Sequence, residues 1–187
     1  MKPSLEYSET KRLILRRPTQ DLYKTLFRWL KDPELTKYVG GVREDDKIQL
    51  TFDHVMKSWN TAGVGKCLVI EKDTLALVGL VGIFPLDLAG TKVNDLGYLI
   101  DSPFSGKGYA TEASEEIVRK GFLDHGMDQI SAWPDPKNAS SVRVVEKLGF
   151  QFVKELNGAY MGMSFSGMHL YKLSRSHWQT TVASHQG

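Results

Sequence analysis

A glycine-rich turn is the stretch of this sequence with the clearest chemical potential. In "DSPFSGKGYATEA", Gly106 and Gly108 flank Lys107, directly after the apolar run "LGYLI" and before a stretch of helical periodicity. Glycine can be needed there because it adopts backbone angles closed to other residues. A turn without side chains at a helix N-terminus also leaves N–H groups that bind phosphate, and Lys107 adds a positive charge. The turn alone leaves both roles open.

The residues around this turn exclude two common nucleotide-binding motifs. A P-loop has Ser or Thr directly after its Gly-Lys pair, whereas Lys107 is followed by Gly108. A dinucleotide-binding turn has Gly or Ala three residues after its second glycine, where this chain has Thr111. Neither motif therefore describes this turn.

Composition and charge exclude several classes of protein. The 187 residues are 41% hydrophobic and 25% charged with a net charge of +2, which is typical of a soluble protein. No run of lysine and arginine alternates with aromatic residues, and the histidines are not paired at metal-ligand spacing. Glycine and proline interrupt the longest apolar segment, and the N-terminus lacks a signal-peptide core. We therefore expect a cytoplasmic protein without metal, nucleic-acid or membrane partners, whose one cysteine, Cys67, is a buried hydrophobe.

Hydrophobic periodicity along the chain predicts one mixed α/β domain over residues 1–187. Helix 109–122 should link two parallel neighbouring strands, and ligands in such sheets bind beyond the carboxyl ends of strands, where the glycine turn lies. The helical stretches are 19–35, 44–59, 109–122 and 139–148, and the strand-like stretches are 12–18, 66–71, 77–84, 92–100, 129–133, 150–156 and 168–173.

A second motif, "NASSVRVVEKLGF", follows the turn by about thirty residues. Asn138 is a good N-cap, Val142, Val145 and Leu148 form an apolar stripe, and Gly149 ends the helix. Together with "GYLIDSPFSGKGYATEA", this motif resembles the GNAT acetyltransferase superfamily, and within it the Rim-like branch whose founding members acetylate ribosomal-protein N-termini. The resemblance covers nearly the full chain, from "RLILRRP" near the start to "LYKLSRSHW" near the end.

The resemblance implies an α/β (α+β) fold with a mixed, mostly antiparallel central sheet that splays open. Acetyl-CoA would lie between two diverging strands with its pyrophosphate on the glycine turn, which gives the two glycines a function. Backbone groups of the preceding strand would pair with the pantetheine arm like an added strand. The implied cofactor-binding residues are Leu99, Ile100, Asp101, Ser105, Gly106, Lys107, Gly108, Tyr109, Ala110 and Asn138.

The chain departs from the family pattern at three positions. Pro103 stands where relatives often have Gln or Arg, and Ser105 replaces a bulkier residue. Both changes remove side-chain help to the phosphates but leave the backbone amides. Val145 stands where many relatives have a tyrosine that acts as general acid. That tyrosine therefore cannot be the acid here.

Acetyl transfer from a thioester to an amine needs a neutral amine and a proton for the departing thiolate. Ser141 matches a serine of the Rim-like branch and is the candidate proton donor, although a serine in the first turn of a helix also has an ordinary capping role. Asp95 stands where relatives often have Glu and is the candidate base, with an exposed strand aspartate as the alternative. Glu112 ranks below Asp95, because the helix dipole alone explains an acidic residue in a first turn.

The acceptor should be an amine of low pKa. An α-amino group with a pKa of about 7.7–8.0 is partly neutral at pH 7, whereas a lysine amine near 10.4 is not. A site with few catalytic groups therefore favours a peptide N-terminus or a small-molecule amine. Tyr38 and Tyr160 are candidate acceptor-binding residues, although the segment 157–168 could equally be a hairpin over the core or the contact of a homodimer. A non-catalytic acyl-CoA-binding module is the alternative function.

Overall fold

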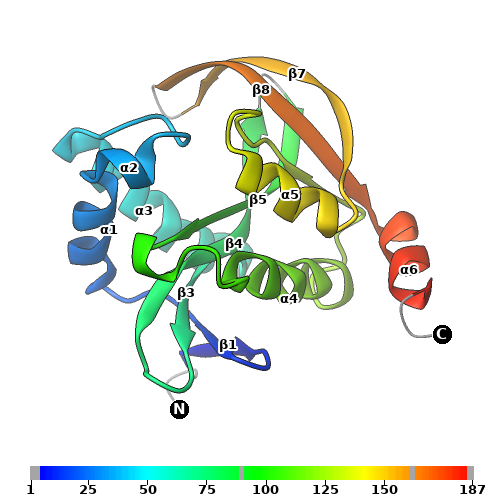
Figure 1. Cartoon of the computed structure of the whole chain (residues 1–187), viewed down its shortest axis with the longest axis horizontal. Coiled ribbons are helices and arrows are strands. Elements are labelled where there is room, and N and C mark those ends of the chain that lie inside the picture. Colours follow the sequence, from blue (N-terminus) through cyan, green and yellow to red (C-terminus); the bar gives the residue numbers. More distant parts are fainter. Residues whose placement is uncertain (1–4, 89–90, 161–162, 185–187) are drawn as a thin grey trace.

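The computed structural model describes residues 5–88, 91–160 and 163–184. Strands in these residues form one sheet in the order β1-β2-β3-β4-β5-β6-β8-β7 (Figure 1). The strands are β1 (Glu6–Glu9), β2 (Leu13–Arg16), β3 (Lys66–Glu71), β4 (Leu77–Leu88), β5 (Thr91–Ile100), β6 (Gln129–Ala132), β7 (Gln151–Tyr160) and β8 (Met163–Ser174). The helices are α1 (Leu22–Leu30), α2 (Pro33–Thr36), α3 (Asp45–Ala62), α4 (Tyr109–Leu123), α5 (Ala139–Lys147) and α6 (Arg175–Ser184), and a 3-10 turn covers Ser102–Phe104.

Two helical layers cover the two faces of the sheet (Figure 1). α1 and α3 pack on one face, against a core that includes Leu68 of β3 and Leu80 of β4. α4 and α5 pack on the other face, against a larger core that includes Val69 and Val81. Because side chains alternate between the faces of a strand, neighbouring residues of β3, β4 and β5 point into different layers. Cys67 is fully buried in the second core, as the sequence predicted.

The sheet opens between β5 and β6. These strands run parallel, as expected for strands joined by a helical crossover, but they pair only at Asp95 and Ser131. β5 stays paired with β4 along its whole length up to Ile100. The edge of β5 beyond Asp95 therefore has no strand on its other side among the described residues. We call this opening between β5 and β6 the wedge. α4 begins at the carboxyl end of the wedge, after the glycine turn. The splayed mixed sheet is therefore confirmed.

Three elements differ from the sequence prediction: the helical stretch 19–35 is divided into α1 and a separate short helix, α2, and α6 and β1 were not predicted. α2 has only four residues and is capped by Asp32, whose side chain accepts hydrogen bonds from the N–H groups of Glu34 and Leu35. α6 lacks a clear apolar stripe, and it is held by packing of Trp178 on Phe122, whose rings lie 5.2 Å apart. β1 is the third such element. The segment 157–168 belongs to the β7–β8 hairpin, one of the alternatives that its sequence left open.

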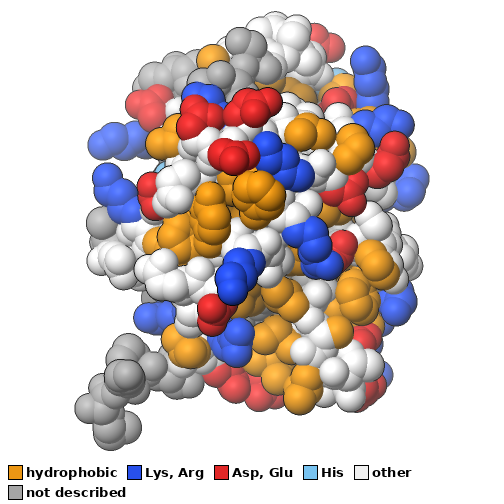
Figure 2. Space-filling view, turned by 90° about the vertical axis from the view of Figure 1, so that its left-hand side faces the viewer, with side chains coloured by type: hydrophobic (Ala, Val, Ile, Leu, Met, Phe, Trp, Pro, Cys, Tyr) orange, Lys and Arg blue, Asp and Glu red, His pale blue; other side chains and the backbone are white. Residues whose placement is uncertain are grey.

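The side of the molecule that bears α1 to α3 shows hydrophobic side chains scattered among charged ones (Figure 2). Four large hydrophobic residues in this part of the chain are more than one-third exposed: Phe27, Val39, Val42 and Leu50. Among the described helices, none combines the length and the apolar character needed to cross a bilayer.

Candidate active site

The glycine turn has the backbone geometry that phosphate binding requires. Gly106 and Gly108 have φ angles of +76° and +80°, in the left-handed region that favours glycine, and Gly108 is the N-cap of α4. Within the described residues, the N–H groups of residues 106–110 have no hydrogen-bond acceptor. These five N–H groups therefore surround the positive end of the α4 dipole and are free to bind an anion.

Ser105 differs from the other predicted residues of the turn. Its N–H already donates to the carbonyl oxygen of Ser102 at 3.1 Å, because Ser105 closes the 3-10 turn. An anion could use this N–H only if that hydrogen bond were shared or broken. The free donors therefore begin at Gly106, one residue later than the sequence predicted.

Arg12, directly before β2, contacts the glycine turn. Its guanidinium donates to the carbonyl oxygen of Lys107 at 3.0 Å, pairs with Glu112 at 2.6 Å and lies 4.6 Å from the centre of the Tyr109 ring. Thr10 also donates to Glu112, at 2.6 Å. Glu112 thus connects α4 to the segment between β1 and β2, a structural role beyond the dipole interaction expected from the sequence. Arg12 was not predicted, because it lies 95 residues before Lys107.

The register of β5 decides which backbone groups face the wedge. The N–H of Asp101 donates to Val78 of β4 and its carbonyl oxygen accepts from Phe104, both at 2.9 Å. Its side chain is paired with Arg28 at 2.7 Å. Because backbone groups alternate between the two edges of a strand, Leu99 also faces β4, whereas Ile100 faces the wedge. Of the three predicted backbone contacts to pantetheine, the register favours Ile100.

The first turn of α5 brings the hydroxyl of Ser141 next to the hydroxyl of Tyr98 on β5. Asn138 caps this helix, and its Oδ1 accepts hydrogen bonds from Ser141 N at 3.1 Å and Ser140 Oγ at 2.7 Å. The Oγ of Ser141 lies 2.7 Å from the hydroxyl of Tyr98 on β5, which also donates to the Ser141 carbonyl oxygen at 3.1 Å. Burial raises the pKa of Tyr98 to about 12, so its hydroxyl keeps its proton at neutral pH. Tyr98 was missed because nothing in the sequence pairs it with Ser141.

Asp95 is buried, with 4% of its surface exposed, so the exposed strand aspartate expected as an alternative is wrong. The Trp133 side chain hydrogen-bonds to the Asp95 carboxyl group, whereas the other oxygen, Oδ1, has no partner among the described residues. Burial raises the pKa of Asp95 to about 8, although the nearby charge of Lys66 acts in the opposite direction. The group therefore changes protonation state near neutral pH, as a general base must.

Lys66 of β3 is a second titratable group of the site, and the sequence did not indicate it. Its Nζ lies 5.0 Å from the centre of the Phe84 ring. Burial, followed by the charge of Arg43, lowers the pKa of Lys66 to about 8. Lys66, Phe84 and Asp95 lie on one face of the sheet, because Lys66 pairs with Gly82, Gly82 with Gly97, and Phe84 with Asp95.

One cavity of about 390 Å³ joins these groups. Asp95, Lys66, Tyr98, Asn138 and Ser141 all line it. Its outer wall comes from three segments: the loop after α2, the stretch that follows β6, and the β7–β8 hairpin. These segments contribute Tyr38, Val39, Gly40, Gly41, Trp133, Pro134, Asp135, Phe165, Ser166 and Met168. Tyr38 is therefore where the sequence placed it, whereas the side chain of Tyr160 lies outside the described residues.

The match with a known family decides what kind of site this is. A model of the acetyltransferase (GNAT) domain matches residues 12–151, which include both motifs found in the sequence. This chain belongs to the GNAT acetyltransferase family. Members of this family are acetyl-CoA-dependent N-acetyltransferases, so the predicted enzyme class is confirmed.

Proteins similar in sequence occur in Bacillus. The uncharacterized protein YkkB of Bacillus subtilis is 29% identical over 133 residues, which is 71% of this chain and 77% of YkkB. The putative ribosomal N-acetyltransferase YdaF of the same organism is 28% identical over 108 residues, which is 56% of this chain and 57% of YdaF. The name of YdaF agrees with the Rim-like resemblance found in the sequence.

Solved structures confirm the GNAT fold. An acetyltransferase from Agrobacterium tumefaciens superposes with a TM-score of 0.77 at 23% identity and covers 94% of this chain and 100% of that chain. The spermidine N-acetyltransferase of Vibrio cholerae, crystallised with CoA and spermine, superposes with a TM-score of 0.72 at 15% identity and covers 90% and 98%.

The buried carboxyl of this GNAT protein should make stability depend on pH. The pKa of Asp95 is raised from 3.8 to about 8 in the folded state, so its contribution to stability is complete below pH 4 and lost as the pH rises through 8. Asp95→Asn removes this loss. Urea unfolding should show the variant more stable than wild type by up to about 5 kcal/mol at pH 9, the equivalent of raising the pKa by about four units, and nearly equal at pH 4. An equal difference at both pH values would contradict the raised pKa.

Proposed function

We propose that this protein transfers an acetyl group from acetyl-CoA to a primary amine by direct attack, the acceptor being a small-molecule amine or a peptide N-terminus. The observation that carries this proposal is the position of Asp95 and the Ser141–Tyr98 pair in one cavity. Asp95 and Tyr98 are three residues apart on β5, so their side chains project from opposite faces of the strand. A base and a proton donor thus flank the open edge of β5.

The residues of the wedge fit acetyl-CoA. Five free N–H groups at the start of α4 suit a pyrophosphate, and Lys107 is exposed beside them. The backbone of Ile100 and the side-chain NH₂ of Asn138, whose Oδ1 is already used for capping, suit the amides of the pantetheine arm. The spermidine N-acetyltransferase of Vibrio cholerae, which has the same fold, was crystallised with CoA.

The reaction needs two proton transfers, one at each face of β5. Acetyl-CoA supplies an activated acetyl group, and a neutral amine attacks its carbonyl carbon, so that a C–N bond forms and the C–S bond breaks. Asp95 accepts the proton that the amine loses, and Ser141 supplies a proton to the departing sulfur while Tyr98 holds its hydroxyl. Because the pKa of Asp95 is near 8, the ionised base becomes more abundant, and turnover rises, from pH 6 to pH 9.

Two measurements test this proposal: binding of acetyl-CoA to the protein, and release of CoA from acetyl-CoA when an acceptor is present. A hundredfold excess of acetyl-CoA over its Kd should stabilise the fold by about 2.7 kcal/mol, seen as a rise in Tm. With a panel of small amines and peptides, thiol detection should show acceptor-dependent release of CoA and mass spectrometry an acetylated amine. Binding without release of CoA for any acceptor would favour the non-catalytic acyl-CoA-binding module. No rise in Tm and no heat of binding would overturn the proposal itself.

A further inference from the structure

The wall of the cavity opposite Tyr98 carries an unpaired cation. Within the described residues, no hydrogen bond of the Lys66 Nζ and no ion pair within 4.0 Å is found, and Nζ lies 5.0 Å from the centre of the Phe84 ring. The neighbouring Arg43 also lines the cavity and has the same charge, and it donates to Thr51 Oγ1 at 2.7 Å. Asp95 is near enough to interact with the charge of Lys66 but forms no ion pair with it within 4.0 Å. A partly desolvated cation without a directly paired carboxylate favours an anionic ligand group.

We propose that the acceptor is a free α-amino acid, whose carboxylate binds Lys66 while its amino group lies at Asp95. The inference rests on the proposed acetyl transfer and deepens it by naming the chemical class of the acceptor. Under this inference the enzyme recognises the carboxylate of the acceptor as well as its amine.

The spacing of the two side chains fits an amino acid. Lys66 Nζ lies 3.5 Å from the point where a Cβ would stand on Gly97, and Gly97 is two residues from Asp95 on the same face. Two residues along a strand span roughly 6.5 Å. Among the described residues, Lys66 and Asp95 form no ion pair within 4.0 Å. Two side chains that rise from strand positions with this spacing leave room between them for an amino group and a carboxylate joined by one carbon. Oδ1 of Asp95, which has no partner, is an available acceptor for the amino group.

Two glycines let Lys66 reach this position. Gly82 and Gly97 lie beside Lys66 in register on β4 and β5, so the lysine side chain crosses strands that have no side chains there. A Cβ on Gly82 would lie 2.4 Å from Lys66 Cα, and a Cβ on Gly97 would lie 3.4 Å from Lys66 Cε. A larger residue at Gly97 would displace the lysine stem, and a larger residue at Gly82 would collide with the backbone of Gly65 and Lys66. The pairing of β3, β4 and β5 therefore determines the path of the Lys66 side chain.

Charge and lining favour an amino acid with an apolar or aromatic side chain. At neutral pH Lys66 is mostly protonated and Asp95 mostly neutral, because both have pKa values near 8, so the pair has an excess of positive charge. Asp135 also lines the cavity, but its Oδ1 accepts a hydrogen bond from Lys137 N at 2.8 Å. A polycation would be repelled by the charges of Arg43 and Lys66. The rest of the lining includes several aromatic and apolar side chains. The aromatic and large apolar residues concerned are Tyr38, Phe84, Trp133, Phe165 and Met168.

Equilibrium binding tests the carboxylate directly. L-phenylalanine, L-methionine and L-leucine are titrated calorimetrically into the protein saturated with CoA, and each is compared with its amide, which lacks the negative charge. We expect wild type to bind at least one amino acid about 10- to 100-fold more tightly than its amide, the range for a hydrogen-bonded charged group. In Lys66→Met, which keeps an apolar stem of similar length, this ratio should fall to near one.

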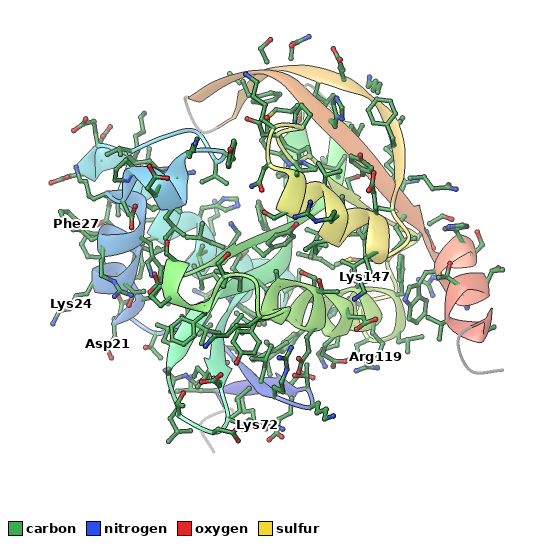
Figure 3. The ribbon with its side chains drawn as sticks, viewed as in Figure 1. Asp21, Lys24, Phe27, Lys72, Arg119 and Lys147 are labelled. Atoms are coloured by element: carbon green, nitrogen blue, oxygen red, sulfur yellow. The ribbon has the colours of Figure 1, made fainter. Side chains whose placement is uncertain are left out.

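Controls separate the charge of Lys66 from general effects. Lys24→Met makes the same change on α1, where Lys24 points away from the molecule (Figure 3), and should leave the ratio as in wild type. CoA affinity and Tm are measured for every variant, and Lys66→Gln replaces Lys66→Met if that variant unfolds. Equal binding of amino acids and amides to wild type, no binding of any amino acid, or an unchanged ratio in both Lys66 variants would overturn the inference.

Turnover distinguishes this inference from the proposed function. If neutral amines are acetylated as readily as amino acids and the binding ratio is one, acetyl transfer stands and the carboxylate site is wrong. If amino acids bind with the expected ratio but no acceptor releases CoA, the carboxylate site stands and the proposed transfer is wrong.

Discussion

Gly108→Val is expected to abolish detectable CoA binding while the circular dichroism spectrum stays near that of wild type. The φ angle of Gly108 is +80°, which a β-branched residue cannot adopt without strain, so the turn must rearrange and its N–H groups lose their common direction. Each hydrogen bond to a charged phosphate contributes about 1.5–3 kcal/mol. Loss of two such bonds raises the Kd by roughly 10²–10⁴-fold, so isothermal titration calorimetry should detect no heat of binding at CoA concentrations that saturate wild type.

Gly126→Val is the matched control for this prediction. Gly126 follows α4, has a φ of +65°, and a Cβ on it would lie 4.0 Å from Arg175 Nη2, much as a Cβ on Gly108 would lie 3.5 Å from Arg12 Nη2. Similar backbone strain is therefore introduced away from the turn. Gly126→Val should lose stability but keep the affinity for CoA. If folded Gly108→Val binds CoA as wild type does, its glycine is only structural.

Ser141→Ala is expected to lower kcat by roughly 10²–10⁴-fold, the usual range for a general acid, and to leave CoA affinity nearly unchanged. The structural reason is that Ser141 Oγ lines the cavity and is held at 2.7 Å from the Tyr98 hydroxyl. Loss of this hydrogen bond alone would lower stability by about 1 kcal/mol and leave kcat nearly intact at a temperature where the protein stays folded. Steady-state kinetics with a good acceptor measures the difference.

Tyr98→Phe completes this test, because it removes the hydroxyl that contacts Ser141 but keeps the ring. If the two hydroxyls act as one unit, the double variant should be no slower than the slower single variant. If Ser141→Ala turns over normally with any good acceptor, Ser141 is not the proton donor. Normal turnover of Ser141→Ala combined with a large loss in Tyr98→Phe would assign the proton transfer to the tyrosine.

Local sequence determined the parts of the site that depend on a few consecutive residues. The left-handed angles of Gly106 and Gly108, the start of α4 and the Asn138 cap all follow from residue type and short spacing, and all were predicted. The same holds for most strands and for α1, α3, α4 and α5, because their hydrophobic periodicity is strong. The order of the sequence motifs along the chain indicated the family, and the resemblance to that family implied the splayed sheet.

Only the tertiary structure decided the protonation chemistry of the site. Asp95 is a candidate base because helices and neighbouring strands bury it, and burial is what raises its pKa. Lys66 reaches the same cavity because the register of three strands aligns it with two glycines, and Tyr98 meets Ser141 because α5 packs over β5. The contact between Tyr98 and Ser141 joins residues 43 positions apart, and the pKa of a buried group depends on surroundings of this kind. No local pattern in the sequence carries that information, whereas the packed fold does.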